Sequence, residues 1–169
     1  MQHHGAPTRL LDWTESPYVA AYFAAEQCPD KDGAVYVVHA GLVNMEHQTG
    51  PGTDSSTFEA QLKDRKSPNQ VLFYYPDYQT DRMIAQRGHF SVNLHVLGGH
   101  DDSLLRTLAT ISQREGMGYV CGKWLIPSSQ KADFVRQLRV MNVAPHAMFP
   151  GLDGLGRSVD GLIRLLVLA

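Results

Sequence analysis

Hydrophobic and polar positions alternate along this chain in patterns that predict short strands and amphipathic helices. Runs rich in β-branched and aromatic residues indicate strands, and apolar residues spaced three or four apart indicate helices. A short strand is expected just before residue 14, with further strands at residues 34–40, 71–75, 89–96 and 119–126. Helices are expected at residues 17–26, 56–63, 79–86, 102–114 and 129–141, with a terminal helix starting at Asp153 or Ser158.

Two of these patterns carry more detail. In the segment 89–96, apolar and polar residues alternate, which predicts a half-buried strand with one polar face. In the terminal helix, the apolar side chains fall on one stripe, formed by Leu155, Val159, Leu162, Ile163 and Leu166.

Together these elements predict an α+β fold, with a mixed sheet of about five strands packed with about five helices. At 169 residues we expect one domain, spanning residues 1–169.

Composition and charge narrow the function classes. The formal net charge is −2, which does not favour a nucleic-acid binder. No apolar run is long enough to span a bilayer, and Met1 leads directly into a polar segment, so we expect no leader and no membrane contact. The two cysteines, Cys28 and Cys121, fit no metal or redox spacing. A cytoplasmic protein is therefore expected.

The stretch at residues 2–14 is unlike an ordinary core segment. It places two imidazoles, an arginine, an aspartate, a tryptophan and two threonines around a Gly-Ala-Pro turn. Because an unpaired buried charge is costly, Arg9 and Asp12, which flank two leucines, are expected to have fixed partners. They form either a structural clasp or the wall of a site. As a buried clasp, the pair would lose about 3–5 kcal/mol of stability on Asp12→Ala.

The next helix begins with a clear signal. Ser16 is expected to cap the free amides, and Pro17 fits the first helical position. A helix N-terminus is also a natural phosphate seat, and Arg9 could grip a phosphate with two parallel hydrogen bonds. The alternatives are local: Thr14 caps the turn, and Arg9 pairs with Asp12 or Asp153.

Several segments together resemble one family. Residues 2–14 (Gln-His-His-Gly-Ala-Pro-Thr-Arg-Leu-Leu-Asp-Trp-Thr), followed by Ser16-Pro17, resemble the signature of FRG domains. Similar pieces follow in the same order at residues 86–90, 124–127 and 148–155. The Phe-Arg-Gly tripeptide that names the family lies upstream of the signature in other members, so the resemblance implies a domain without that N-terminal element.

FRG domains are in turn distantly similar to ADP-ribosyltransferases. The resemblance implies an ADP-ribosyltransferase-like fold that binds an NAD-like nucleotide, with ADP-ribosyl transfer or NAD glycohydrolysis in a bacterial or phage defence or toxin context. NAD would be a substrate, and no metal is implied. The catalytic candidates are His4, Asp12, Thr14 and Asp153. The candidates for binding the nucleotide are Arg9, Trp13, Ser16, Tyr22 and Gln86, with Tyr74 as another aromatic wall for the nicotinamide.

Each of these residues also has a structural interpretation. His4 could hydrogen-bond the backbone, and Asp153, beside a glycine, could cap a helix. The paired acids typical of transferases that modify protein side chains are absent from the sequence. This favours an alternative function, a non-catalytic module that recognises a partner protein or a nucleotide signal. A nuclease would need clustered carboxylates, for which Asp101 and Asp102 alone are poor candidates, and His89 and His95 lie too far apart to share one metal.

Overall fold

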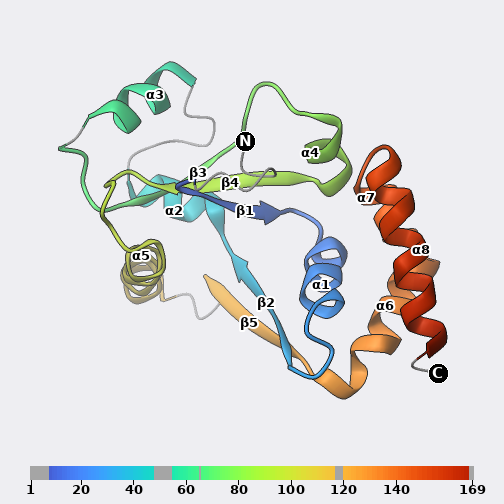
Figure 1. The fold of residues 1–169 in the computed structure, drawn as a ribbon. Coiled ribbons are helices and arrows are strands. Elements are labelled where there is room, and N and C mark those ends of the chain that lie inside the picture. The colour runs from blue at the N-terminus through green and yellow to red at the C-terminus, as the bar shows by residue number, and fades with distance from the viewer. Residues whose placement is uncertain (1–7, 48–54, 65, 117–119, 168–169) are drawn as a thin grey trace. The chain divides into compact units, whose positions relative to one another are not determined.

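The chain divides into two compact units whose segments interleave in the sequence. The structure, a computed structural model, describes residues 8–47, 55–64, 66–116 and 120–167. Unit 1 comprises Met1–Trp13, Val37–Asp77 and His89–Gly122, and unit 2 comprises Thr14–Tyr36, Tyr78–Gly88 and Lys123–Ala169. Figure 1 gives the order of the elements. The expectation of a single domain stays a prediction.

A three-stranded sheet supports unit 1. Its strands are ordered β1 (Leu10–Thr14), β4 (Gly88–Asn93) and β3 (Val71–Tyr74). Strands β3 and β4 run antiparallel, with Phe73 opposite Ser91 and Tyr74 opposite Phe90. Strand β4 is the strand for which the sequence predicted a polar face. Its polar residues Ser91 and Asn93 are buried rather than solvated, since they are only 0% and 3% exposed. Both polar side chains are hydrogen-bonded, which is what allows a polar face inside a fold.

Three helices complete unit 1: α2 (Ala40–Glu46), α3 (Ser55–Lys63) and α5 (His100–Glu115). Helix α2 packs against β3 and α5. The buried Asn44 amide of α2 donates to the Phe73 carbonyl and accepts from the Phe73 amide, which ties this helix to β3. The buried apolar side chains of this core are Val43, Val71, Phe73, Leu104, Leu108, Ile111 and Val120.

Unit 2 is mainly helical. Its helices are α1 (Pro17–Glu26), α4 (Asp81–Gln86), the 3-10 turn η2 (Ser128–Gln130), α6 (Lys131–Val140), α7 (Pro145–Met148) and α8 (Leu152–Val167). Helix α1 packs on α6, and α7 packs on both α8 and α4. The core of this unit is formed by Val19, Tyr22, Leu138, Met148 and Phe149. The buried Lys131 ammonium donates to the carbonyls of Gln27 and Cys28, which satisfies the end of α1.

The remaining two strands form a sheet of their own. Strand β2 (Gly33–Val38) pairs with β5 (Cys121–Ile126), and the residues of each strand are divided between the two units. The α+β class and the five strands are confirmed within the described residues, but the single sheet is wrong because the strands divide into two sheets. Eight α-helices are described instead of about five, and sequence reasoning missed α2 and α7, which are short.

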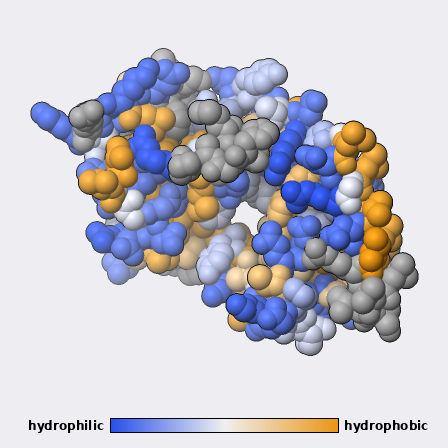
Figure 2. Space-filling model, in the orientation of Figure 1, coloured by the Kyte–Doolittle hydropathy of each residue, from blue (hydrophilic) through white to orange (hydrophobic). Residues whose placement is uncertain are grey.

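The terminal helix packs through its small residues rather than its apolar stripe. Gly154 and Ser158 of α8 are buried, and a Cβ on Gly154 would lie 2.0 Å from the Phe149 carbonyl oxygen. Leu155, Val159 and Ile163 of the stripe are instead 56–57% exposed. Hydrophobic residues, coloured orange, are visible on the surface at the right edge of Figure 2, where Figure 1 draws α8. Close approach of α8 to α7 requires the glycine, so the small residues select the buried face.

Candidate functional site

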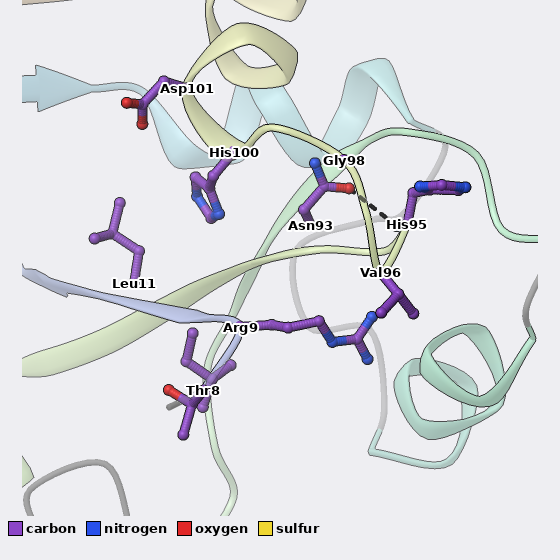
Figure 3. Close-up of a pocket in the computed structure, with 10 residues that line it drawn as sticks. Thr8, Arg9, Leu11, Asn93, His95, Val96, Gly98, His100 and Asp101 are labelled. Carbon is purple, nitrogen blue, oxygen red and sulfur yellow. Dashed lines mark hydrogen bonds between the residues drawn. The ribbon is translucent and has the colours of Figure 1, made fainter. Parts of the chain in front are cut away.

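A cavity of about 260 Å³ opens beside the start of β1 in unit 1. The cavity is surrounded by three segments: the residues just before and within β1, the end of β4 with the turn after it, and the first residues of α5 (Figure 3). The lining residues are Thr8, Arg9, Leu10, Leu11, Asn93, His95, Val96, Gly98, His100 and Asp101. We call this the polar cavity, because it collects an arginine, two histidines, an amide and a carboxylate.

Arg9 is the cation of the polar cavity. Its half-buried side chain extends from the start of β1 toward Val96 (Figure 3). One guanidinium nitrogen, Nη1, donates to the Leu94 carbonyl at 3.2 Å. Among the described residues this is its one hydrogen bond, and no ion pair forms there. A guanidinium has five N–H donors, so this anchored group keeps donors available for a ligand.

His100, the first residue of α5, lines the same cavity. Its Nε2 lies 2.8 Å from the Ser91 hydroxyl oxygen, which also accepts a hydrogen bond from the Trp13 indole at 2.7 Å. Burial lowers the pKa of His100 below its usual value, while the nearby Asp101 carboxylate partly opposes that shift. The imidazole is therefore mostly neutral near pH 7, as an acid–base group or a neutral hydrogen-bonding group would be.

The other polar groups of the cavity, Asn93 and Asp101, differ in their hydrogen bonding and exposure. The Asn93 amide nitrogen donates to the Asn69 side-chain oxygen and to the Gly99 carbonyl, and its oxygen accepts from the His95 amide. Asn93 is therefore a support that shapes the turn. Asp101 is exposed in the first turn of α5 and places a negative charge at the cavity's edge.

A second cavity, of about 280 Å³, also opens beside β1. It is lined by Arg9, Leu10, Leu62, Tyr74, Phe90 and Val92. We call it the apolar cavity. Arg9 and Leu10 line both cavities, so the polar cavity and the apolar cavity share residues at the start of β1. Tyr74, a candidate wall in the sequence, is here together with Phe90, which sequence reasoning did not select.

Three candidates from the sequence, Thr14, Ser16 and Gln86, lie in unit 2 and are hydrogen-bonded to one another and to the backbone. The Thr14 hydroxyl donates to the Gln86 carbonyl at 2.7 Å and accepts from the Ser16 amide at 3.0 Å. The Ser16 hydroxyl accepts from the Val19 amide at 3.3 Å, as predicted for a cap. The Gln86 side-chain amide donates to the Met148 carbonyl. These groups join segments far apart in the sequence, which is a structural role.

The remaining candidates do not converge. Tyr22 is 3% exposed in the core of unit 2, where burial and the Glu26 carboxylate raise its pKa, so the nicotinamide-wall assignment is wrong for this ring. Asp153 is exposed in the first turn of α8. Asp12 is exposed on β1, so the expectation of a buried Arg9–Asp12 clasp is wrong. His4 lies outside the described residues.

Over residues 8–47, 55–64, 66–116 and 120–167, no cluster of three or more metal-ligating side chains is present. Within the same ranges, no helix is both long and apolar enough to cross a bilayer.

The comparison with known families concerns the beginning of the chain. Residues 1–33 match the FRG domain family. The FRG match includes β1, α1 and the first residue of β2, and therefore both Arg9 and the capped start of α1. No curated protein and no solved structure matches the chain. Outside the FRG match, the assignment of the site depends on the geometry alone.

Sequence reasoning did not select Ser91, Phe90 or His100 as site residues. Two signals were present. His100 follows Gly98-Gly99 at a predicted helix start, and Ser91 falls on the polar face of the predicted strand. Neither signal shows that the two side chains meet, because that contact depends on how the tertiary fold brings the first residue of α5 to β4.

Proposed function

We propose that this chain binds a nucleotide-like ligand, with a phosphate at Arg9 in the polar cavity and a flat ring in the apolar cavity. The observation that carries the proposal is that Arg9 lines both cavities. A guanidinium binds phosphate oxygens through paired N–H donors, and aromatic side chains such as Tyr74 and Phe90 offer faces or edges to a base. An NAD-like dinucleotide carries both groups, as the resemblance to FRG domains implies.

Cleavage of such a ligand at its glycosidic bond would require an acid near the cleaved bond, because the transition state resembles an oxocarbenium ion. Asp101 is the carboxylate among the residues lining the polar cavity. ADP-ribosyl transfer and NAD glycohydrolysis therefore require that Asp101 acts as this acid. The defence or toxin context stays a prediction.

A recognition module that binds a nucleotide without turnover is the second candidate. It is favoured by the exposure of Asp12 and Asp153, the acids named from the sequence, neither of which lines the polar or the apolar cavity. The two candidates share the binding step and differ in chemistry, so one experiment can separate them.

The test is calorimetric titration of the protein with ADP, ADP-ribose and NAD, together with an assay for nicotinamide release. Arg9→Gln should weaken ADP binding about tenfold or more, since a hydrogen bond to a charged group is lost. Arg106→Gln, an exposed arginine of α5 outside both cavities, is the matched control and should bind normally. Absence of ADP binding, or equal loss in the two variants, would contradict the proposal. Binding without nicotinamide release would favour the recognition module.

A further inference from the structure

Trp13, Ser91 and His100 form a chain of two hydrogen bonds through the Ser91 hydroxyl. In this chain, one arrangement of the protons gives every proton an acceptor. Ser91 is 0% exposed, so water does not reach its hydroxyl. Its oxygen lies 2.7 Å from the Trp13 indole nitrogen and 2.8 Å from His100 Nε2. Within the described residues these are the hydrogen-bond partners of the hydroxyl.

Counting protons decides the direction of each bond. An indole nitrogen can only donate, so Ser91 accepts from Trp13. The hydroxyl proton of Ser91 then has His100 Nε2 as its acceptor. If Nε2 carried a proton instead, the hydroxyl proton would be buried without an acceptor, which proteins rarely tolerate. His100 Nε2 is therefore unprotonated, and a neutral imidazole must carry its proton on Nδ1.

We propose that Ser91, oriented by Trp13, is a positioning residue that fixes the proton of His100 on Nδ1, so that His100 is a second donor for the anionic group bound at Arg9. The tautomer follows from the protein alone. The use of His100 by a ligand rests on the proposed function, since it assumes that a phosphate occupies the polar cavity.

Two further observations agree with this assignment. No described side chain or carbonyl accepts a hydrogen bond from Nδ1, so its proton remains available to a ligand. His100 also stands at the N-terminus of α5, where the helix dipole disfavours an imidazolium and favours the neutral ring. A neutral donor beside a guanidinium suits a ligand that presents oxygen acceptors, such as a phosphate or a carboxylate.

The direct test is a nitrogen NMR spectrum of the histidine side chains in the free protein above pH 7. The His100 signals are identified by their loss in His100→Gln, and His95→Gln identifies the other imidazole of the cavity. We expect Nδ1 to be the protonated nitrogen of His100 and Nε2 to be the unprotonated one. A protonated Nε2 on a neutral His100 would overturn the proposal.

Variants then test the role of Ser91. Ser91→Ala removes the hydroxyl that donates to Nε2, so the spectrum should show a mixture of tautomers. Binding of ADP should weaken severalfold, because the His100 proton is then partly on Nε2. Ser91→Thr, which keeps the hydroxyl, should keep the Nδ1–H tautomer, and so should Trp13→Phe, because the hydroxyl proton still has Nε2 as its acceptor. An unchanged tautomer in Ser91→Ala would overturn the assignment of Ser91.

The two proposals fail in different ways. An Nδ1–H tautomer in a protein that does not bind ADP supports the role of Ser91 and contradicts the proposed function. Binding of ADP that depends on Arg9, in a protein whose neutral His100 is protonated on Nε2, supports the proposed function and overturns the role of Ser91. If Ser91→Ala does not fold, the tautomer of His100 in the unmodified protein still decides.

Discussion

The helices α1 and α5 begin in opposite ways, and the difference explains where a ligand site can form. At the start of α1, the Ser16 hydroxyl accepts from the Val19 amide, Pro17 has no amide proton, and Thr14 accepts from the Ser16 amide. At the start of α5, the cap is Gly99 and no side chain caps the helix. Arg9 and His100 line a cavity there.

A helix start whose amides are already bound by capping side chains is therefore a poor phosphate-binding site. The capping groups that make α1 recognisable in the sequence are the groups that occupy its first amides. Helix α5 has a weak start signal, and two carboxylates, Asp101 and Asp102, lie in its first turn. Its contribution to a site comes from His100 and the neighbouring Arg9 more than from its amides.

The largest effect is expected at Tyr22, on the buried face of α1. Tyr22→Ala removes a ring that is 3% exposed in the core of unit 2, and it should lower the free energy of unfolding by about 3–5 kcal/mol. Tyr18→Ala, an exposed tyrosine on the same helix, is the control and should change stability little. Urea denaturation measures both. If the two variants were equally stable, α1 would not be a core helix.

A smaller loss of stability is expected at the cap of α1. Thr14→Val keeps the side-chain volume but removes the acceptor for Ser16 and the donor for Gln86, so it should cost about 1–2 kcal/mol. Because Thr14 is here a structural residue, the affinity of the folded variant for ADP should equal that of the unmodified protein. A folded Thr14→Val protein with much weaker ADP binding would move the site to α1.

Protonation should affect unit 1 through His100, at the start of α5, and His47, which contacts Thr107 of α5. Burial lowers the pKa of both histidines in the folded state. Their contribution to stability is complete above about pH 6.5, the usual histidine pKa. As the pH falls below this value, the unfolded chain takes up protons first, so stability declines until the lowered pKa values of the folded state are reached. In urea denaturation at a series of pH values, the free energy of unfolding of His47→Gln and of His100→Gln should fall less steeply as the pH is lowered. An unchanged dependence on pH in both variants would contradict this role of the two histidines.

The smallest effect is expected for Asp12→Ala. Asp12 is exposed on β1, so solvent screens its charge and its removal should change stability by about 0.5 kcal/mol or less. This replaces the larger loss expected from a buried clasp. A loss of about 3 kcal/mol in thermal denaturation would restore the clasp interpretation.

The sequence predicted what depends on neighbouring residues. The start of α1 follows from Ser16-Pro17, and β3 follows from a compact apolar run, so both are confirmed almost to the residue. The terminal helix is also confirmed, but its buried face was not predictable from the apolar stripe. That face depends on how closely α8 approaches α7, which Gly154 permits.

The site was less predictable because its parts come from distant segments. Arg9 was identified as a phosphate ligand from the sequence, and it lines both cavities. Its partners could not be assigned, since the contact of Ser91 with His100 depends on how the tertiary fold brings the first residue of α5 to β4. Thr14, Ser16 and Gln86 were recognised as related residues, but their hydrogen bonds are to one another and to the backbone.

The most direct measurement is a titration of the isotope-labelled protein with ADP, followed through the backbone amide signals at both helix starts. We expect the signals of Arg9, Leu94 and residues 98–101 to shift together with one affinity, while those of Thr14, Ser16 and Val19 stay in place. Arg9→Gln should abolish these shifts at the same ADP concentrations, and Arg106→Gln should leave them intact. Shifts centred on residues 14–19 with no change at His100 would contradict the assignment of the site to unit 1.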